Sequence, residues 1–163
     1  AGSLLATYGI NMFAGPLLGA LVGRIGERAT IQLENISLIV VFVGYALASH
    51  GTFGNWGALF AGAFFVIDGV CFTLVLAQRT YFQKIADPAD IAPTSAVAFT
   101  INHIAAVFLP ITFGLIWLRD PALVFYIGAG VATASLGLSL LVPRHPVAGH
   151  ETTLSAPAPA AAE

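Results

Sequence analysis

The chain has 163 residues, of which 58% are hydrophobic and 9% are charged, and its formal net charge is -2. A soluble domain carries about 25% charged residues, so this composition excludes an ordinary water-exposed globule. The near-zero charge and the lack of a basic run argue against a nucleic-acid partner. The single cysteine, Cys71, excludes an internal disulfide and a cysteine-based metal site. We therefore expect an all-α integral membrane protein, with the lipid bilayer as its main surroundings.

Five apolar segments are long enough to span a bilayer, which takes about 20 residues of helix. We expect transmembrane helices at residues 1–23, 30–49, 56–78, 92–118 and 122–142. Residues 144–163 are rich in Pro, Ala, Ser and Thr without apolar periodicity, which predicts a disordered tail. No basic region precedes the first apolar run, so the start of the chain lacks the pattern of a signal peptide. Because the number of expected helices is odd and the start is uncharged, we expect further helices to precede Ala1.

The basic residues are distributed unevenly among the expected loops. Five of the six follow the first, third or fifth helix, and these are Arg24, Arg28, Arg79, Lys84 and Arg144. Only Arg119 lies in a loop on the other side. Basic residues are enriched in cytoplasmic loops, so we expect a multi-pass protein of the cell (inner or plasma) membrane with a cytoplasmic C-terminus.

The first basic loop carries a recognisable motif, Gly19-Ala20-Leu21-Val22-Gly23-Arg24-Ile25-Gly26-Glu27-Arg28. It resembles the loop signature G-x-L-x-D-R-x-G-R-R of the major facilitator superfamily. The matching residues are Gly19, Leu21, Arg24, Gly26 and Arg28. Gly23 replaces the acidic position and Glu27 a basic one, as in the degenerate copy that follows the eighth helix of that family.

This resemblance implies a partial major-facilitator-type helical bundle that contains the eighth to twelfth helices of a twelve-helix fold. It also implies a secondary transporter, in which two six-helix halves rock about a central site. The missing N-terminal helices of the same transporter would then be a partner of this chain. In the superfamily the tenth and eleventh helices face the cavity, and the cytoplasmic signature contributes to gating, here through Arg24.

Two ionisable side chains fall near the middle of the expected spans: Asp68 in the third and His103 in the fourth. A charge near the bilayer centre costs about 2.5–3.5 kcal/mol on insertion scales. Either the two residues are protonatable sites that couple proton movement to solute movement, or they are held by helix-to-helix hydrogen bonds and polar packing. Direct pairing of Asp68 with His103 is a further hypothesis.

Other polar residues in the spans have the same two interpretations. Thr100, Asn102 and Asn11 either contact the solute or form hydrogen bonds between helices. Glu34, about one turn into the second span, is either half of a gating ion pair with Arg24 or Arg28, or an interfacial carboxylate that reaches water.

We therefore expect a carrier of a small solute, either proton-coupled or facilitative, that works by alternating access. The alternative is a non-transporting five-helix scaffold or assembly subunit, whose polar residues only hold helices together. An enzyme is disfavoured, because the sequence contains no phosphate-binding glycine loop with lysine, nucleophile elbow or metal-ligand cluster. No cofactor or metal is expected.

Overall fold

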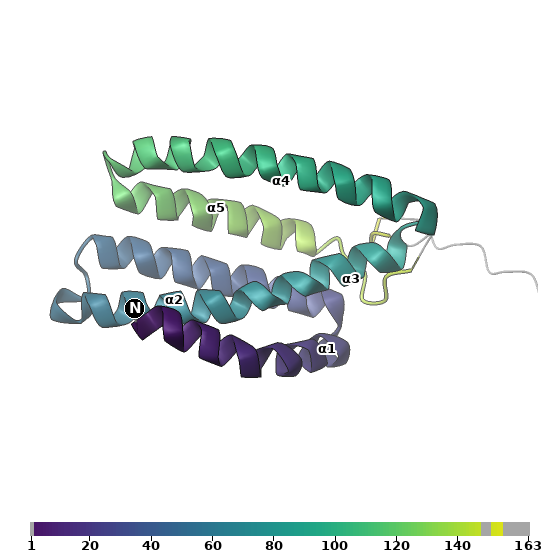
Figure 1. Ribbon diagram of the computed structural model, residues 1–163, viewed down its shortest axis with the longest axis horizontal. Coiled ribbons are helices and arrows are strands. Elements are labelled where there is room, and N and C mark those ends of the chain that lie inside the picture. Colours follow the sequence, from purple (N-terminus) through teal and green to yellow (C-terminus); the bar gives the residue numbers. More distant parts are fainter. Residues whose placement is uncertain (1, 148–150, 155–163) are drawn as a thin grey trace, which may run out of the picture.

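A computed structural model of the chain describes residues 2–147 and 151–154, with the backbone alone at residues 2–19, 21, 22 and 73. The elements in chain order are α1 (Gly2–Ser49), η1 (Gly54–Trp56), α2 (Gly57–Cys71), η2 (Phe72–Val75), α3 (Leu76–Ile85), α4 (Pro88–Trp117) and α5 (Pro121–Ser139), where η1 and η2 are 3₁₀ helices. The described residues contain no β-strand, which confirms the all-helical fold class. Figure 1 shows these helices as long rods that run side by side.

Four described segments are long and apolar enough to cross a membrane: Gly23–Ser49, Gly54–Ile85, Pro88–Trp117 and Pro121–Ser139. They correspond to the second to fifth expected spans and indicate a membrane protein. The backbone of the first expected span forms the N-terminal part of α1. Nearly all of its side chains lie outside the described residues, so the count of five spans stays a prediction.

The observed boundaries differ from those expected at the third and fourth spans. The helix that includes α2 continues through η2 into α3, so Arg79 and Lys84 lie on a helix rather than in a loop. The turn before α4 is short because Asp87 and Pro88 start the next helix at once. The Asp87 carboxylate accepts a hydrogen bond from the Ala89 N–H at 2.8 Å, and proline suits the first helical position. Asp120 and Pro121 start α5 in the same way.

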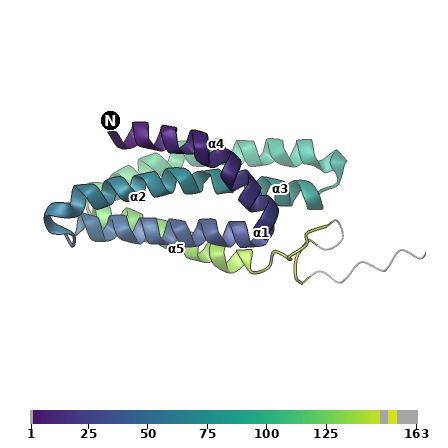
Figure 2. The same ribbon diagram turned by 90° about the horizontal axis from the view of Figure 1, so that it is seen from below.

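Helix α1 consists of two parts, one before and one after Gly26, and Figure 2 shows them meeting at a bend. The second part, after Gly26, is the centre of the packing, since α2 and α5 both lie against α1. Small residues allow the close approach of α5, whose buried positions are Ala122, Ala129, Ala132 and Ser139. Close packing over small residues is typical of helix pairs in membranes.

Aromatic rings fill the space between helices near the turn that joins α1 to η1. Tyr45 of α1 stacks on Phe125 of α5 with ring centroids 5.0 Å apart, and it meets the edge of Phe64 of α2 at 5.8 Å. Trp117, at the end of α4, also packs against Phe125, edge to face, with ring centroids 5.6 Å apart. These rings join four helices at one end of the bundle.

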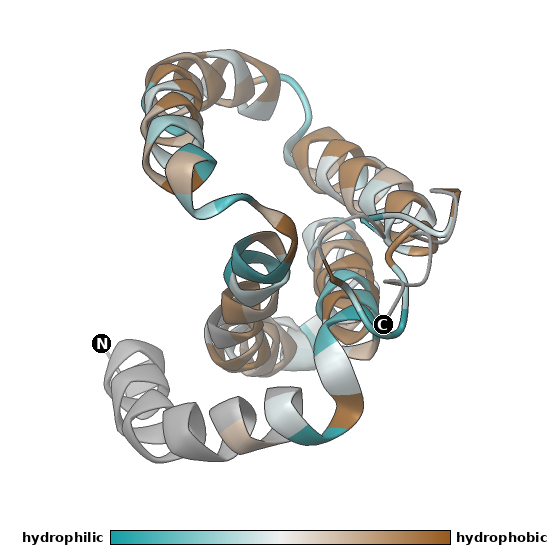
Figure 3. Cartoon of the chain, turned by 90° about the vertical axis from the view of Figure 1, so that its right-hand side faces the viewer, coloured by the Kyte–Doolittle hydropathy of each residue, from teal (hydrophilic) through white to brown (hydrophobic). Residues whose placement is uncertain are grey.

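By contrast, α4 lies at the edge of the structure. It packs mainly against α5, and none of its residues is buried. Its exposed apolar side chains include Phe99, Ile104, Phe108, Ile111 and Leu115. In Figure 3, hydrophobic residues lie on the outer faces of the helices as well as between them. A surface this apolar requires lipid or further protein around it.

The residues that follow α5 lie against the opposite end of the bundle from the aromatic rings. Pro146 is buried, the Thr153 N–H donates to the Leu141 carbonyl at 2.8 Å, and the Tyr81 hydroxyl donates to the carbonyl of Glu151. Residues 148–150 and 155–163 lie outside the described part of the chain. The disorder expected for the tail as a whole stays a prediction.

Candidate functional site

Gly26 separates the two parts of α1 within the loop motif. Its backbone has φ of 81° and ψ of 164°, whereas its neighbours on both sides are helical. This combination is essentially restricted to glycine. The motif glycine therefore turns the chain between two helices, as a loop between two spans requires.

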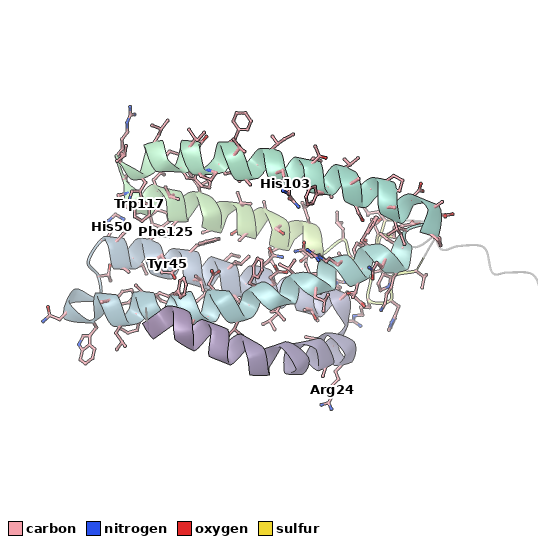
Figure 4. All side chains as sticks on the ribbon, in the orientation of Figure 1. Arg24, Tyr45, His50, His103, Trp117 and Phe125 are labelled. Atoms are coloured by element: carbon pink, nitrogen blue, oxygen red, sulfur yellow. The ribbon has the colours of Figure 1, made fainter. Side chains whose placement is uncertain are left out.

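The basic residues of the motif gather with others at this end of the molecule. Arg24 and Arg28 line the same pocket as Lys84, at the end of α3, and Arg144, after α5. Figure 4 shows Arg24 at the opposite end of the bundle from Trp117 and His50. Residues from three separate expected loops thus share one end of the bundle.

An ion pair that the sequence did not suggest ties the motif to α3. The Lys84 ammonium lies 2.5 Å from a carboxylate oxygen of Glu27. Glu27 is the residue that replaces a basic position of the motif. Its side chain is 8% exposed and that of Lys84 is 52% exposed. The opposite charges of two loop residues were visible in the sequence, but their proximity depends on how α3 packs against α1.

Glu34 has a different partner from those expected. Its carboxylate is buried and accepts a hydrogen bond of 3.2 Å from the Gln78 amide on α3. Among the described residues no ion pair joins Glu34 to Arg24 or Arg28. The contact therefore connects α1 to α3 without a neutralising cation.

Asp68 lies on the face of α2 that is turned toward α1. It is half-buried and follows Phe64 by four residues, which places both on one side of the helix. Phe64 contacts Tyr45. Asp68 thus lies beside the aromatic rings between α1, α2 and α5, and its main-chain carbonyl accepts from the Phe72 N–H where η2 begins.

His103, Thr100 and Asn102 lie on α4 and are all exposed. The His103 ring lies 3.9 Å from the Phe99 ring, centroid to centroid, and its Nδ1 is 2.9 Å from the Phe99 carbonyl oxygen. The Thr100 hydroxyl donates to the Ala96 carbonyl at 3.0 Å. In the described part of the chain, no hydrogen bond or ion pair joins His103 to Asp68.

The remaining predicted site residues, Asn11, Gly19 and Leu21, lie on the backbone of α1. Their side-chain surroundings are outside the described residues. Among the described residues, no group of three or more His, Cys, Asp or Glu side chains has the arrangement of a metal site.

In comparisons with known proteins, no family model matches this chain, and neither a curated protein nor a solved structure is significantly similar to it.

Proposed function

We propose that the chain is part of the C-terminal half of a secondary transporter of the major facilitator type, which moves a small solute across the cell membrane by alternating access. The observation that carries the proposal is the break at Gly26. It falls inside the motif that resembles the superfamily signature and separates two helical segments. On this interpretation the helices are the eighth to twelfth of the fold.

The basic pocket supports the orientation that we propose. Arg24, Arg28, Lys84 and Arg144 line it together, and clustered basic residues mark the cytoplasmic side of membrane proteins. The C-terminus would then be cytoplasmic. Arg24 would act at the cytoplasmic gate, together with the Glu27–Lys84 ion pair, which holds the loop against α3. In a rocking carrier such a contact would be broken and remade.

The exposure of α4 supports the proposal that other helices of a transporter pack against this chain. Thirty residues of helix have no buried side chain, and three polar residues at mid-length, Thr100, Asn102 and His103, are exposed. Polar groups are costly against lipid and usually face protein or a water-filled cavity. An N-terminal half placed against α4 would provide that cavity, and transporters bind their solutes near the midplane between such halves.

The proton-coupling role that we propose for Asp68 and His103 is tested by transport. The complete gene product would be reconstituted in vesicles with an imposed pH gradient, and a metabolite mixture would be assayed by mass spectrometry for solutes that accumulate inside. We expect Asp68→Asn and His103→Gln to lower pH-driven accumulation at least tenfold. Asp90→Asn, an exposed change at the start of α4, is the matched control.

Each outcome has a clear meaning. If neither Asp68→Asn nor His103→Gln changes the accumulation of the solute, these residues are not proton-coupling sites. The protein would then be a facilitative carrier. No accumulation of any solute by a folded wild-type protein would favour the alternative, a scaffold or assembly subunit.

The membrane topology has its own test, which uses the single cysteine. In a Cys71→Ser background, cysteines would be placed one at a time at positions 24, 79 and 119 and labelled with an impermeant maleimide in intact cells. We expect only position 119 to react from outside. Labelling of positions 24 and 79 from opposite sides would overturn the proposed arrangement of spans.

A further inference from the structure

The residues that line the pocket at the basic end of the bundle carry an excess of positive charge. Its volume is about 840 Å³, which falls within the range of small-molecule sites. Four cationic side chains line it, those of Arg24, Arg28, Lys84 and Arg144, against one carboxylate, Glu27. That carboxylate is paired with Lys84. The charged side chains of the lining, counted by themselves, therefore leave an excess of three positive charges, which the three arginines carry.

The arginines come from different parts of the chain. Arg24 and Arg28 flank the break at Gly26, and Arg144 follows α5. Their convergence on one pocket therefore depends on the fold rather than on a local basic run. Arginine presents several N–H donors in a planar fork, which suits the oxygens of a phosphate group. The pocket thus has the charge and the donors for a phosphate-bearing anion.

The apolar part of the lining indicates which phosphate source fits. Ile25 and Val147 line the pocket and are exposed, and the partly exposed Ala29 lines it as well. The pocket also lies at an end of the long apolar helices, where the headgroups of a surrounding bilayer would be. A lipid can place its phosphate among the arginines and its acyl chains along the exposed apolar side chains.

We propose that this pocket binds a phosphate group, and that its ligand is the headgroup of an anionic phospholipid. Basic pockets between transmembrane helices on the cytoplasmic side bind such headgroups. The site is separate from the solute cavity proposed above, because Asp68 and His103 do not line it. Lipid binding at this position does not require that the protein transports anything.

The test compares two double variants that remove the same charge. Arg28→Gln with Arg144→Gln empties the pocket of two cations. Arg79→Gln with Arg119→Gln removes two exposed arginines that do not line the pocket. The purified chain would be incubated in micelles with equal amounts of phosphatidylglycerol and phosphatidylcholine that carry the same acyl chains, and retained lipid would be measured by native mass spectrometry.

We expect the wild-type chain and the Arg79/Arg119 double variant to retain phosphatidylglycerol in preference to phosphatidylcholine. The Arg28/Arg144 double variant should lose that preference by about tenfold, because each basic residue near the surface contributes several-fold to anionic lipid binding. Arg28→Lys with Arg144→Lys keeps the charge and should retain most of the preference. If the glutamine variant is not folded by circular dichroism, the single variant Arg144→Gln, which lies outside the helices, takes its place.

A second arm separates lipid from free phosphate. Thermal stability of the chain would be followed with added inorganic phosphate against chloride at matched ionic strength. Stabilisation by phosphate that depends on Arg28 and Arg144, without a lipid preference, would assign the site to soluble phosphate. An equal loss of lipid preference in both double variants, or no dependence on Arg28 and Arg144 in either arm, would overturn the proposal.

Discussion

Lys84 and Glu27 are 57 positions apart in the sequence, yet their charged groups lie 2.5 Å from one another. The pair joins the end of α3 to the start of the second part of α1, next to the break at Gly26. The two partners are unequally exposed, since Glu27 is almost covered and Lys84 is half in solvent. Removing the charge of Lys84 and removing that of Glu27 should therefore change the free energy of unfolding by different amounts.

Lys84→Met should lower the free energy of unfolding by about 1–3 kcal/mol, because it leaves a nearly buried carboxylate without this cation. Glu27→Gln should cost less than about 1 kcal/mol, since an exposed ammonium is readily solvated. Unfolding in mixed micelles by titration with sodium dodecyl sulfate measures both. Arg79→Met, on the exposed surface of α3, serves as the control. Equal costs for Lys84→Met and Arg79→Met would contradict this account of the pair.

The hydrogen bond from Gln78 to Glu34 predicts another stability difference. Gln78→Leu removes the amide donor from a buried carboxylate and should cost about 1–3 kcal/mol. The double variant Glu34→Leu with Gln78→Leu should recover much of that loss, because both polar groups are then gone. Gln83→Leu changes an exposed glutamine on the same helix and should have little effect in the same titration. A double variant less stable than Gln78→Leu alone would show that Glu34 stabilises α1 in another way.

Gly26→Ala tests the break within α1. An alanine strongly disfavours φ of 81° with ψ of 164°, and the strain should cost about 1–3 kcal/mol. Gly23→Ala lies three residues earlier on regular helix, where an added Cβ meets no atom within 4 Å. It should be neutral or stabilise the chain by up to about 1 kcal/mol. Thermal unfolding of the two variants in the same detergent makes the comparison, and equal melting temperatures would refute the strain argument.

Gly44→Ala tests the contact between α1 and α2. A Cβ at this position would overlap the Phe64 ring, so the helices or the ring must move, at a cost of about 1–3 kcal/mol. In a Phe64→Leu background the same change should cost clearly less, because the end of the ring is absent. Gly62→Ala on α2 meets no atom within 4 Å and is the control. A cost of Gly44→Ala that is independent of residue 64 would place the close contact elsewhere.

The helices were predictable from hydropathy, but their ends were not. Apolar length places a span near residues 56–78, whereas the helix continues to Ile85 because backbone hydrogen bonding does not stop where polarity begins. The helix ends where Asp87 and Pro88 start α4, and neither residue belongs to an apolar run. In the same way α4 begins at Pro88 rather than at residue 92.

The residue types of the candidate site were predictable, but their partners were not. The sequence identified Glu34 as a carboxylate in need of a partner, yet the partner is Gln78, whose position depends on how the α2–α3 rod packs against α1. Glu27 and Lys84 were both visible as charged loop residues, and their pairing has the same dependence. The grouping of the basic residues at one end could be predicted because it follows from alternating spans alone.

The 3₁₀ stretch η2 has a consequence for the direction in which polar groups point. In an uninterrupted α-helix, successive residues turn by about 100°, so Asp68 and Gln78 would point about a quarter of a turn apart. Each residue of a 3₁₀ helix turns by about 120°, and the four residues Phe72–Val75 add about 80° in all. That extra rotation brings the two side chains into phase along the rod. Both consequently face α1: Asp68 on the side of Phe64, which contacts Tyr45, and Gln78 at Glu34.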